Sequence, residues 1–254
     1  EVDVIFYVDN SGSVDNTEFD GMSTSIRNVV DYLMPAAGGI VRAAVVHYGS
    51  PAESWESNIY LESDFTDDPA VVKGFARRTG DLGIEDYAAE SLILVGDALD
   101  GVANPHIISP QKRLTRRPGV PLVVFFFTDA GRQWWGTSVV LPAGAPDVFQ
   151  PWNDFKSKRG AKFVSVLVPW APGQNETVHA AAAIASVGGD YTGAIDPNPY
   201  DPEGDGVLPR WNFSASFVLS GNEIQRIAEG ICHLGKPVLS TTLMARSSDA
   251  TWRT

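Results

Sequence analysis

Two short apolar runs constrain the fold of this chain more than any other feature. Residues 2–8 and 120–127 are almost wholly apolar and rich in β-branched or aromatic side chains. Each run is far shorter than the roughly 18–20 apolar residues that a membrane-spanning helix needs. Short continuous runs of this kind are typical of strands that are buried on both faces. The sequence therefore predicts a sheet with these two strands at its centre.

Helical patterns alternate with predicted strands along the rest of the chain. Weaker apolar runs at residues 40–48 and 162–168 predict two more strands, and residues 58–62 alternate as an edge strand does. Apolar spacing typical of helices occurs at about residues 16–34, 68–78, 87–103, 147–158, 175–187 and 221–234. Strands and helices in alternation form crossover units. We therefore expect a doubly wound, Rossmann-like α/β domain, with a mainly parallel central sheet and helices on both faces.

The length of 254 residues fits one large α/β domain with additions. We expect this domain to span residues 1–235, with loop insertions at about residues 132–146 and 195–212. Residues 236–254 are expected to form a C-terminal extension, either an extra strand or a linker to a following domain. The abrupt start at Glu1, without Met, indicates a mature or excised segment of a longer protein.

Composition argues against several classes of function. The chain has 31 acidic and 19 basic residues and a net charge of −12, which disfavours a nucleic-acid partner. No apolar run is long enough to span a membrane. The one cysteine, Cys232, leaves no internal disulfide and no cysteine-rich zinc site, and its helical context predicts a buried thiol. Nucleophile-elbow, phosphate-loop and dinucleotide motifs are missing, so we do not expect an enzyme.

The strongest chemical signal follows the first predicted strand. Asp9, Ser11 and Ser13 stand on alternate residues in a turn that leads into a helix. One carboxylate and two hydroxyls in this arrangement can converge on one point. Oxygen-only ligands suit Mg²⁺, or Ca²⁺ and Mn²⁺ with looser geometry. Helix capping explains a lone Asp-x-Ser-x-Ser pattern about as often as metal binding does.

A second carboxylate makes metal binding the stronger explanation. Asp129 lies just past the apolar run at residues 120–127. Because the carboxyl ends of parallel strands meet at the same edge of a sheet, we expect Asp129 to lie close to Asp9. Two carboxylates at a buried edge repel one another, and a divalent cation between them removes the repulsion.

Together the two motifs resemble the von Willebrand factor A family. Its metal-ion-dependent adhesion site combines an Asp-x-Ser-x-Ser loop, a Thr or acidic residue from a middle loop, and an Asp that ends a hydrophobic strand. Residues 4–14 (Val-Ile-Phe-Tyr-Val-Asp-Asn-Ser-Gly-Ser-Val) and 123–129 carry the resemblance, which covers about residues 1–234. The resemblance implies that Asp9, Ser11 and Ser13 are metal ligands. It also implies that Asp129 binds the cation directly or through water.

The middle ligand is where this sequence departs from the family pattern. Ile93 occupies the position at which many members carry Thr. A β-integrin-like variant of the family uses an acidic residue, in a pattern that residues 83–91 loosely resemble. Glu90 is then the first candidate, with Asp86 and Ser91 as alternatives. A site that none of the three reaches would bind metal weakly or be vestigial.

Two other groups of residues were weighed for function. Alternating acidic residues begin like a calcium loop, but Asn212 stands where such a loop needs its closing Glu, so a solvated acidic loop is favoured. These residues are Asp201, Glu203 and Asp205. Three tryptophans are expected on the metal-bearing edge, where they either bind a partner or pack a loop onto the domain. They are Trp134, Trp135 and Trp170.

The family resemblance implies a metal-dependent adhesion or ligand-binding module. A carboxylate of a protein partner would fill an open coordination position on the cation, Mg²⁺ first, with Ca²⁺ or Mn²⁺ as alternatives. A glycan is an alternative partner, and the setting implied is extracellular or at the cell surface. The alternative function is a structural or assembly domain of a surface filament or secreted machine, with a weak or vestigial metal site. Metal-assisted hydrolysis is a further alternative and requires a general base beside the ion.

Overall fold

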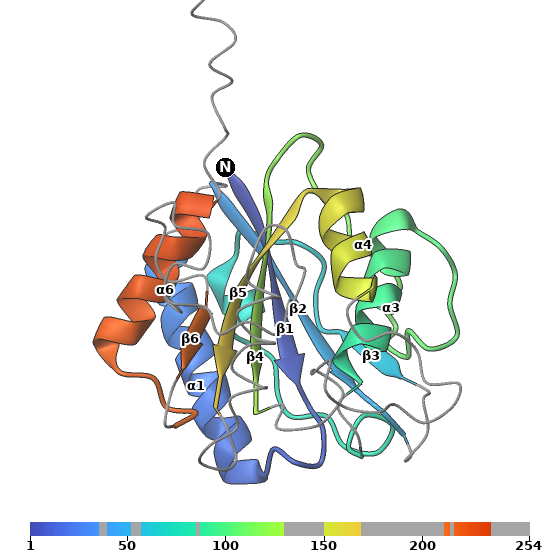
Figure 1. Ribbon diagram of the computed structural model, residues 1–254, viewed down its shortest axis with the longest axis horizontal. Helices are drawn as coiled ribbons and strands as arrows, with labels where there is room; N and C mark the ends of the chain where they lie inside the picture. The colour runs from blue at the N-terminus through green and yellow to red at the C-terminus, as the bar shows by residue number, and fades with distance from the viewer. Residues whose placement is uncertain are drawn as a thin grey trace, which may run out of the picture.

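A six-stranded sheet forms the centre of the molecule in a computed structural model (Figure 1). The structure describes residues 1–35, 40–51, 57–84, 87–129, 150–168, 211–213 and 216–234. The strands are β1 (Val2–Asp9), β2 (Val41–Gly49), β3 (Asn58–Leu61), β4 (Leu122–Thr128), β5 (Ala161–Leu167) and β6 (Trp211–Phe213). Their order is β3-β2-β1-β4-β5-β6, and all neighbours are parallel except β2 and β3. The doubly wound, mainly parallel α/β architecture predicted from the sequence is confirmed.

Helices cover both faces of the sheet (Figure 1). One face packs against α1 (Asn16–Leu33) and α6 (Gly221–Leu234). The other face packs against α3 (Ala88–Asp100) and α4 (Gln150–Arg159). The short helix α2 (Pro69–Val72) lies between β3 and α3 in the chain. No helix in these described ranges combines the length and apolar character that crossing a membrane requires.

Alternation along β1 directs its side chains into two separate cores. Phe6 and Val8 belong to the core under α1 and α6, whereas Ile5 and Tyr7 belong to the core under α3 and α4. Successive side chains of a strand point to opposite faces. Asp9, two residues after Tyr7, therefore leaves the strand on the α3 side at its carboxyl end.

Helix α2 is much shorter than the helix predicted at residues 68–78. Asp68 caps its first turn and Pro69 occupies the first position, but the helix ends at Val72. The backbone carbonyls of the residues that follow accept hydrogen bonds from a side chain of α1 instead of from the helix itself. The Arg27 guanidinium donates to the carbonyls of Lys73 and Phe75, at 3.1 and 2.8 Å. Contacts made from outside the segment thus override its apolar spacing.

The sequence analysis missed β6. The insertion predicted at 195–212 overlaps β6, which pairs with β5 over three residues, Ser165 to Leu167. Three residues are too few to give a periodic signal in a stretch rich in Pro and Gly. The predicted helix at 175–187, the insertion at 132–146 and the extension at 236–254 lie outside the described residues.

Cys232 is exposed, so the prediction of a buried thiol was wrong. Helix α6 directs Ile224, Ile227 and Ile231 into the core. Residues one position apart on a helix point about 100° away from each other. Cys232, directly after Ile231, is consequently turned toward solvent.

Candidate metal site

The register of β1 and β4 places the two predicted acidic motifs side by side. The strands are parallel neighbours, and Val8 pairs with Phe127. Asp9 and Thr128, the next residues along, therefore lie at the same level of the carboxyl edge. Asp129 follows directly. The expectation that Asp129 lies near Asp9 is met by the geometry.

Hydrogen bonds link four of the predicted ligands into one group. The Asp9 carboxylate accepts from the Ser11 amide at 2.9 Å and from the Thr128 hydroxyl at 2.6 Å. The hydroxyl oxygens of Ser11 and Ser13 are 3.0 Å apart. Ser13 in turn donates to Asp129 Oδ1 at 3.1 Å. Two carboxylates and two serine hydroxyls thus converge at one point on the sheet edge.

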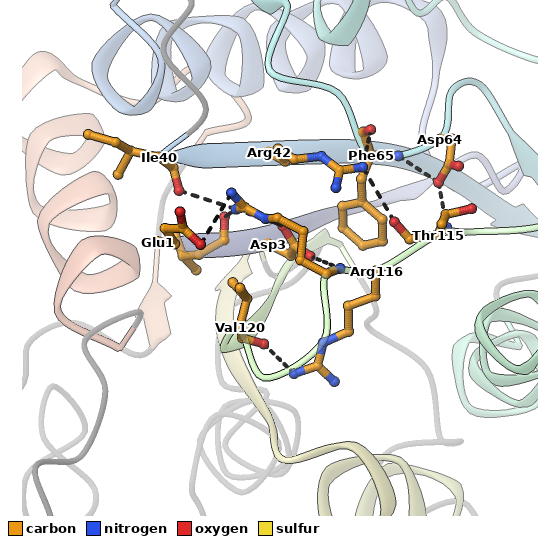
Figure 2. Close-up of polar contacts among 11 residues, drawn as sticks. Glu1, Asp3, Ile40, Arg42, Asp64, Phe65, Thr115, Arg116 and Val120 are labelled. Atoms are coloured by element: carbon orange, nitrogen blue, oxygen red, sulfur yellow. Dashed lines mark hydrogen bonds and ion pairs between the residues drawn. The ribbon is translucent and has the colours of Figure 1, made fainter.

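The lack of an ion pair distinguishes Asp9 from Asp3, the other fully buried carboxylate among the described residues. Asp9 is fully buried, and no lysine, arginine or histidine of the described ranges forms an ion pair with it. At the other end of β1, Asp3 is equally buried, but it accepts hydrogen bonds from the Arg117 guanidinium at 2.8 Å (Figure 2). A buried charge is costly unless it is paired or binds a metal. A bound cation would therefore compensate the charge of the Asp9 carboxylate.

The turn that carries the serines is held tightly against a neighbouring loop. The Gly12 amide donates to the Ile84 carbonyl at 3.3 Å. A Cβ atom at position 12 would lie 2.8 Å from the Gly83 carbonyl oxygen, which is closer than side chains tolerate. The Asn10 amide also donates to the Tyr48 carbonyl at 3.1 Å, just past the end of the β1–β2 pairing. Glycine at position 12 is thus required by close backbone approach.

Two of the candidates for the middle ligand, Glu90 and Ser91, lie in the first turn of α3, near the Tyr7 hydroxyl. Tyr7 donates to the Ala88 carbonyl at 2.7 Å. Burial raises the pKa of Tyr7 well above its ordinary value, and the negative charges of Glu90 and Asp9 raise the pKa further. Glu90 is partly buried, and this burial raises the pKa of its carboxyl. Glu90 and Asp9 thus both act electrostatically on the Tyr7 hydroxyl.

Ser91 has an unusual environment. It is fully buried, and it interacts with the Tyr7 hydroxyl, whose pKa it lowers, but its hydroxyl makes no hydrogen bond of standard geometry to the described residues. Buried hydroxyls are normally satisfied. No hydrogen bond between described residues joins Glu90 or Ser91 to the group around Asp9. Ile93, at the family's Thr position, is 53 % exposed.

Several predicted residues fall outside the described part of the chain. Among the alternatives for the middle ligand this applies to Asp86. It applies as well to the tryptophans Trp134, Trp135 and Trp170, and to the acidic residues Asp201, Glu203 and Asp205. The structure therefore does not test the expected partner contacts of the three tryptophans or the expected calcium loop. It does not test Asp86 as the middle ligand either.

Two contributors to the group were missed by the sequence analysis. Thr128 donates to Asp9 across the strand pair, and its place one residue before Asp129 was the only signal. The Asn10 side chain supports the turn: it donates to the Arg78 carbonyl and accepts from the Arg78 amide. A contact between residues 68 positions apart leaves no local trace in the sequence.

The donor set suits a hard cation. It consists of carboxylate and hydroxyl oxygens, which Mg²⁺, Ca²⁺ and Mn²⁺ prefer. No group of three or more His, Cys, Asp or Glu side chains that could hold a metal occurs among the described residues, so a zinc-type site is not found there. The residues around Asp9 therefore fit a cation that accepts neutral hydroxyl ligands.

A family model of the von Willebrand factor type A domain matches residues 3–194 of this chain. The chain belongs to the von Willebrand factor type A domain family. Residues 3–194 include the group around Asp9, helix α3 with Glu90 and Ser91, and the central strands β1, β4 and β5. No curated protein sequence gives a significant match to this type A domain.

Solved structures share the fold of this type A domain at low sequence identity. BatB from Bacteroides thetaiotaomicron is 13 % identical with a TM-score of 0.54, covering 93 % of this chain and 100 % of that one. The pilus adhesin SpaC from Lactobacillus rhamnosus GG, in its open conformation, is 12 % identical with a TM-score of 0.55, covering 92 % and 29 %. Proximal thread matrix protein 1 from the mussel byssus is 15 % identical with a TM-score of 0.50, covering 92 % and 46 %. The chain thus spans less than half of the byssus protein and of SpaC, and the likeness concerns the fold.

Proposed function

We propose that this type A domain binds a divalent cation at the group around Asp9 and uses the cation to hold a carboxylate of a partner protein. Mg²⁺ is the expected metal, with Ca²⁺ or Mn²⁺ as alternatives. The ligands are Asp9, Ser11, Ser13 and Asp129. The observation that carries the proposal is the fully buried Asp9 carboxylate, which has no ion-pair partner among the described residues.

The energetics of burial support a bound cation. Removing one carboxylate from water costs several kcal/mol even after the protein relaxes. Two hydrogen bonds, from the Ser11 amide and the Thr128 hydroxyl, offset part of that cost. A divalent ion would offset the rest, and it would also separate Asp9 from the second carboxylate, Asp129.

The exposure of the group supports partner binding from solvent. Ser13 and Gly12 are exposed, whereas Asp9, Ser11 and Asp129 are buried. A cation bound to the buried oxygens of Asp9, Ser11 and Asp129 would have its open coordination position on the solvent side, near Ser13. Because Ser11 and Ser13 contribute neutral hydroxyls, the ion keeps enough positive charge to attract one more carboxylate.

Glu90 is proposed as the middle ligand, with Ser91 and Asp86 as alternatives. Glu90 is supported by its partial burial and by its proximity to the Tyr7 hydroxyl, on which Asp9 also acts. Ser91 is supported by its buried hydroxyl, which lies near Tyr7 and makes no hydrogen bond of standard geometry within the described ranges. Metal affinities of Glu90→Gln, Ser91→Ala and Asp86→Asn variants would separate the three candidates. The true ligand is the one whose substitution weakens binding most.

We further propose that the protein acts in adhesion, outside the cell or at its surface. We propose no enzymatic activity. The likeness to the SpaC pilus adhesin supports the adhesion role at the level of the fold. A protein with an acidic side chain is the proposed partner and a glycan the alternative, with Trp134, Trp135 and Trp170 as proposed contacts. A calcium loop at Asp201, Glu203 and Asp205 stays a secondary proposal.

A structural or assembly domain with a weak metal site is the second candidate function. The similarity in fold to a thread matrix protein of the mussel byssus favours it. In that case the group around Asp9 would hold the sheet edge together rather than a partner. The two functions differ in whether a bound metal accepts an external carboxylate.

Water-proton relaxation of Mn²⁺ bound to the protein tests this difference. Bound Mn²⁺ speeds the relaxation of its coordinated water, so binding to the unmutated protein should raise the rate and Asp9→Asn should not. A short peptide that contains one Asp should then lower the enhancement by displacing that water. The same peptide with Asn in place of Asp is the matched control and should have no effect. Enhancement that neither peptide changes would exclude the adhesion mechanism and leave the structural function.

A further inference from the structure

We propose that Arg77 and Arg78 position residues 9–13, the metal loop, for cation binding. The proposal rests on the metal site proposed above and names two residues outside it. Both arginines lie in the segment after α2, which the sequence predicted to be helical and which is not. Neither offers an oxygen ligand, so both would act through the loop. They are positioning residues in this sense.

The Arg77 guanidinium holds the backbone of the metal loop from outside. It donates to the Ser11 carbonyl at 3.4 Å and makes a shorter bond to the Val14 carbonyl. It also donates to the Asn16 side chain at 3.1 Å, at the start of α1, and lies over the Phe19 ring at 5.8 Å from its centre. Arg77 therefore joins the loop to the first turn of the helix that follows it.

Arg78 holds the other end of the loop through its backbone. Its amide donates to Asn10 Oδ1 at 2.8 Å, and its carbonyl accepts from the Asn10 amide group. The Arg78 side chain is itself fixed: it donates to both oxygens of Glu62, at 2.7 and 2.5 Å, and stacks on the Tyr60 ring at 3.8 Å. The loop is consequently tied to the end of β3.

These contacts determine which loop atoms face the site. The carbonyls of Ser11 and Val14 point toward Arg77, and the Asn10 side chain points toward Arg78. The hydroxyls of Ser11 and Ser13 are left to converge on Asp129. A loop that is already ordered loses less conformational entropy when a cation binds. Partners of this outer kind commonly change metal affinity by about 10- to 100-fold.

Electrostatics alone predict the opposite effect. A guanidinium close to the loop repels a cation, so removal of Arg77 would strengthen binding if its charge were its main influence. Positioning predicts that removal weakens binding. The sign of the change therefore distinguishes the two.

Calorimetric titration of Mn²⁺ into the unmutated protein, Arg77→Ala and Arg77→Lys tests the proposal. We expect Arg77→Ala to weaken binding by at least about tenfold. Arg77→Lys keeps the charge and can reach one carbonyl, so its Mn²⁺ affinity should lie between those of the unmutated protein and Arg77→Ala. Asn10→Ala, which removes both bonds to the Arg78 backbone, should weaken binding as well.

Arg42→Ala is the matched control. Arg42 also donates to two backbone carbonyls, those of Phe65 at 2.6 Å and Thr115 at 3.4 Å, and lies over the Phe65 ring (Figure 2). It stands at the amino end of β2, opposite the metal loop. Its loss should leave the Mn²⁺ affinity within about twofold of the unmutated value, since it changes no contact near the site.

Hydrogen exchange of the Ser11, Gly12 and Ser13 amides in chelator gives a second readout that needs no metal. Arg77→Ala should speed exchange at these amides, and Arg42→Ala should not. Unchanged exchange, or a Mn²⁺ affinity that rises or stays constant in Arg77→Ala, would overturn the positioning role. Failure of the unmutated protein to bind Mn²⁺ would overturn the metal site instead, and faster exchange in Arg77→Ala would still show that Arg77 orders the loop.

Discussion

Asp3 and Asp9 stand at opposite ends of β1, and both are fully buried. Asp3 accepts from the Arg117 amide and guanidinium, each at 2.8 Å, so its charge is compensated within the protein (Figure 2). Asp9 accepts only neutral donors in the described part of the chain, the Ser11 amide and the Thr128 hydroxyl. The same residue type on one strand therefore serves structure at one end and, in our account, cation binding at the other.

Replacement of Asp9 by Asn should stabilise the metal-free domain. The Asn amide oxygen can accept from the Ser11 amide, and its NH₂ group can donate to the Thr128 hydroxyl. Removal of a buried, unpaired charge should then raise the free energy of unfolding in chelator by about 1 kcal/mol or more. Urea unfolding in the presence of chelator measures this change.

Asp3→Asn is the control for that prediction. It leaves the Arg117 guanidinium without its carboxylate, so it should lower the free energy of unfolding by about 3 kcal/mol. Equal destabilisation by Asp3→Asn and Asp9→Asn would contradict the distinction between the two residues.

Substitution of Gly12 by Ala should damage the metal loop. The new Cβ atom would lie 2.8 Å from the Gly83 carbonyl oxygen, and this backbone atom can move only with its loop. We expect a loss of about 1–3 kcal/mol in the free energy of unfolding, together with weaker Mg²⁺ binding. Gly221→Ala at the start of α6, where a Cβ meets no atom within 4 Å, should not lower the free energy of unfolding and should leave Mg²⁺ binding unchanged. Circular dichroism melts and calorimetry on the two variants would check the contrast.

At the scale of elements, the buried strands were predictable and the short or externally held segments were not. β1 and β4 are continuous apolar runs that only burial on both faces explains, and the sequence predicted them to within one or two residues. α2 and β6 span four and three residues, below the length at which periodicity is informative. The segment that carries Arg77 was predicted as a helix because its apolar spacing can be read from the sequence. Its contacts with α1 and the metal loop cannot.

The candidate site was predictable for the same reason. Asp9, Ser11 and Ser13 are close in sequence, and the parallel arrangement of two recognisable strands brings Asp129 to them. The roles of Asn10 and Thr128 required the register between elements. The sequence left the middle ligand open among Glu90, Ser91 and Asp86, because residues 83–91, at and just before the start of α3, match the family pattern only loosely.

A buried cluster that links β2 to the end of β3 should make the stability depend on pH. His47 Nε2 lies 3.1 Å from Glu62 Oε1, and Arg78 holds the same carboxylate. Burial would raise the pKa of Glu62, but the hydrogen bonds from His47 and Arg78 outweigh it and lower this pKa from 4.5 to about 2. Burial lowers the pKa of His47 below its ordinary value of 6.5. Both groups bind protons more weakly in the folded than in the unfolded chain.

Acid should therefore destabilise the domain in two steps. Below pH 6.5 the unfolded chain takes up a proton on His47 that the folded one resists. The contribution of Glu62 is complete above pH 4.5 and is lost as the pH falls toward 2. Urea unfolding at a series of pH values should show the unmutated protein more stable than Glu62→Gln at neutral pH. The difference should vanish near pH 2, and a difference that is constant with pH would contradict this account.

At the scale of the whole molecule, a bound cation should stabilise the folded state. The net charge of −12 favours cation binding in general, so the effect must be shown to depend on the site. A ligand at 100 times its Kd adds about 2.7 kcal/mol to the free energy of unfolding. For a domain of this size that corresponds to a rise in Tm of about 5–10 °C. Thermal melts of the unmutated protein and of Asp129→Asn, in Mg²⁺ and in chelator, should show the rise in the former and most of it lost in the latter.

The central claim is that Asp9 and its neighbours hold a divalent cation, and calorimetric titration of Mg²⁺ into metal-free protein tests it most directly. The unmutated domain should bind one Mg²⁺ near or below millimolar concentration, Asp9→Asn should bind none at that site, and Asp3→Asn should keep the affinity where it remains folded. Binding of equal strength in the unmutated domain and in Asp9→Asn, or no binding in either, would contradict the claim and leave a type A domain whose sheet edge is purely structural.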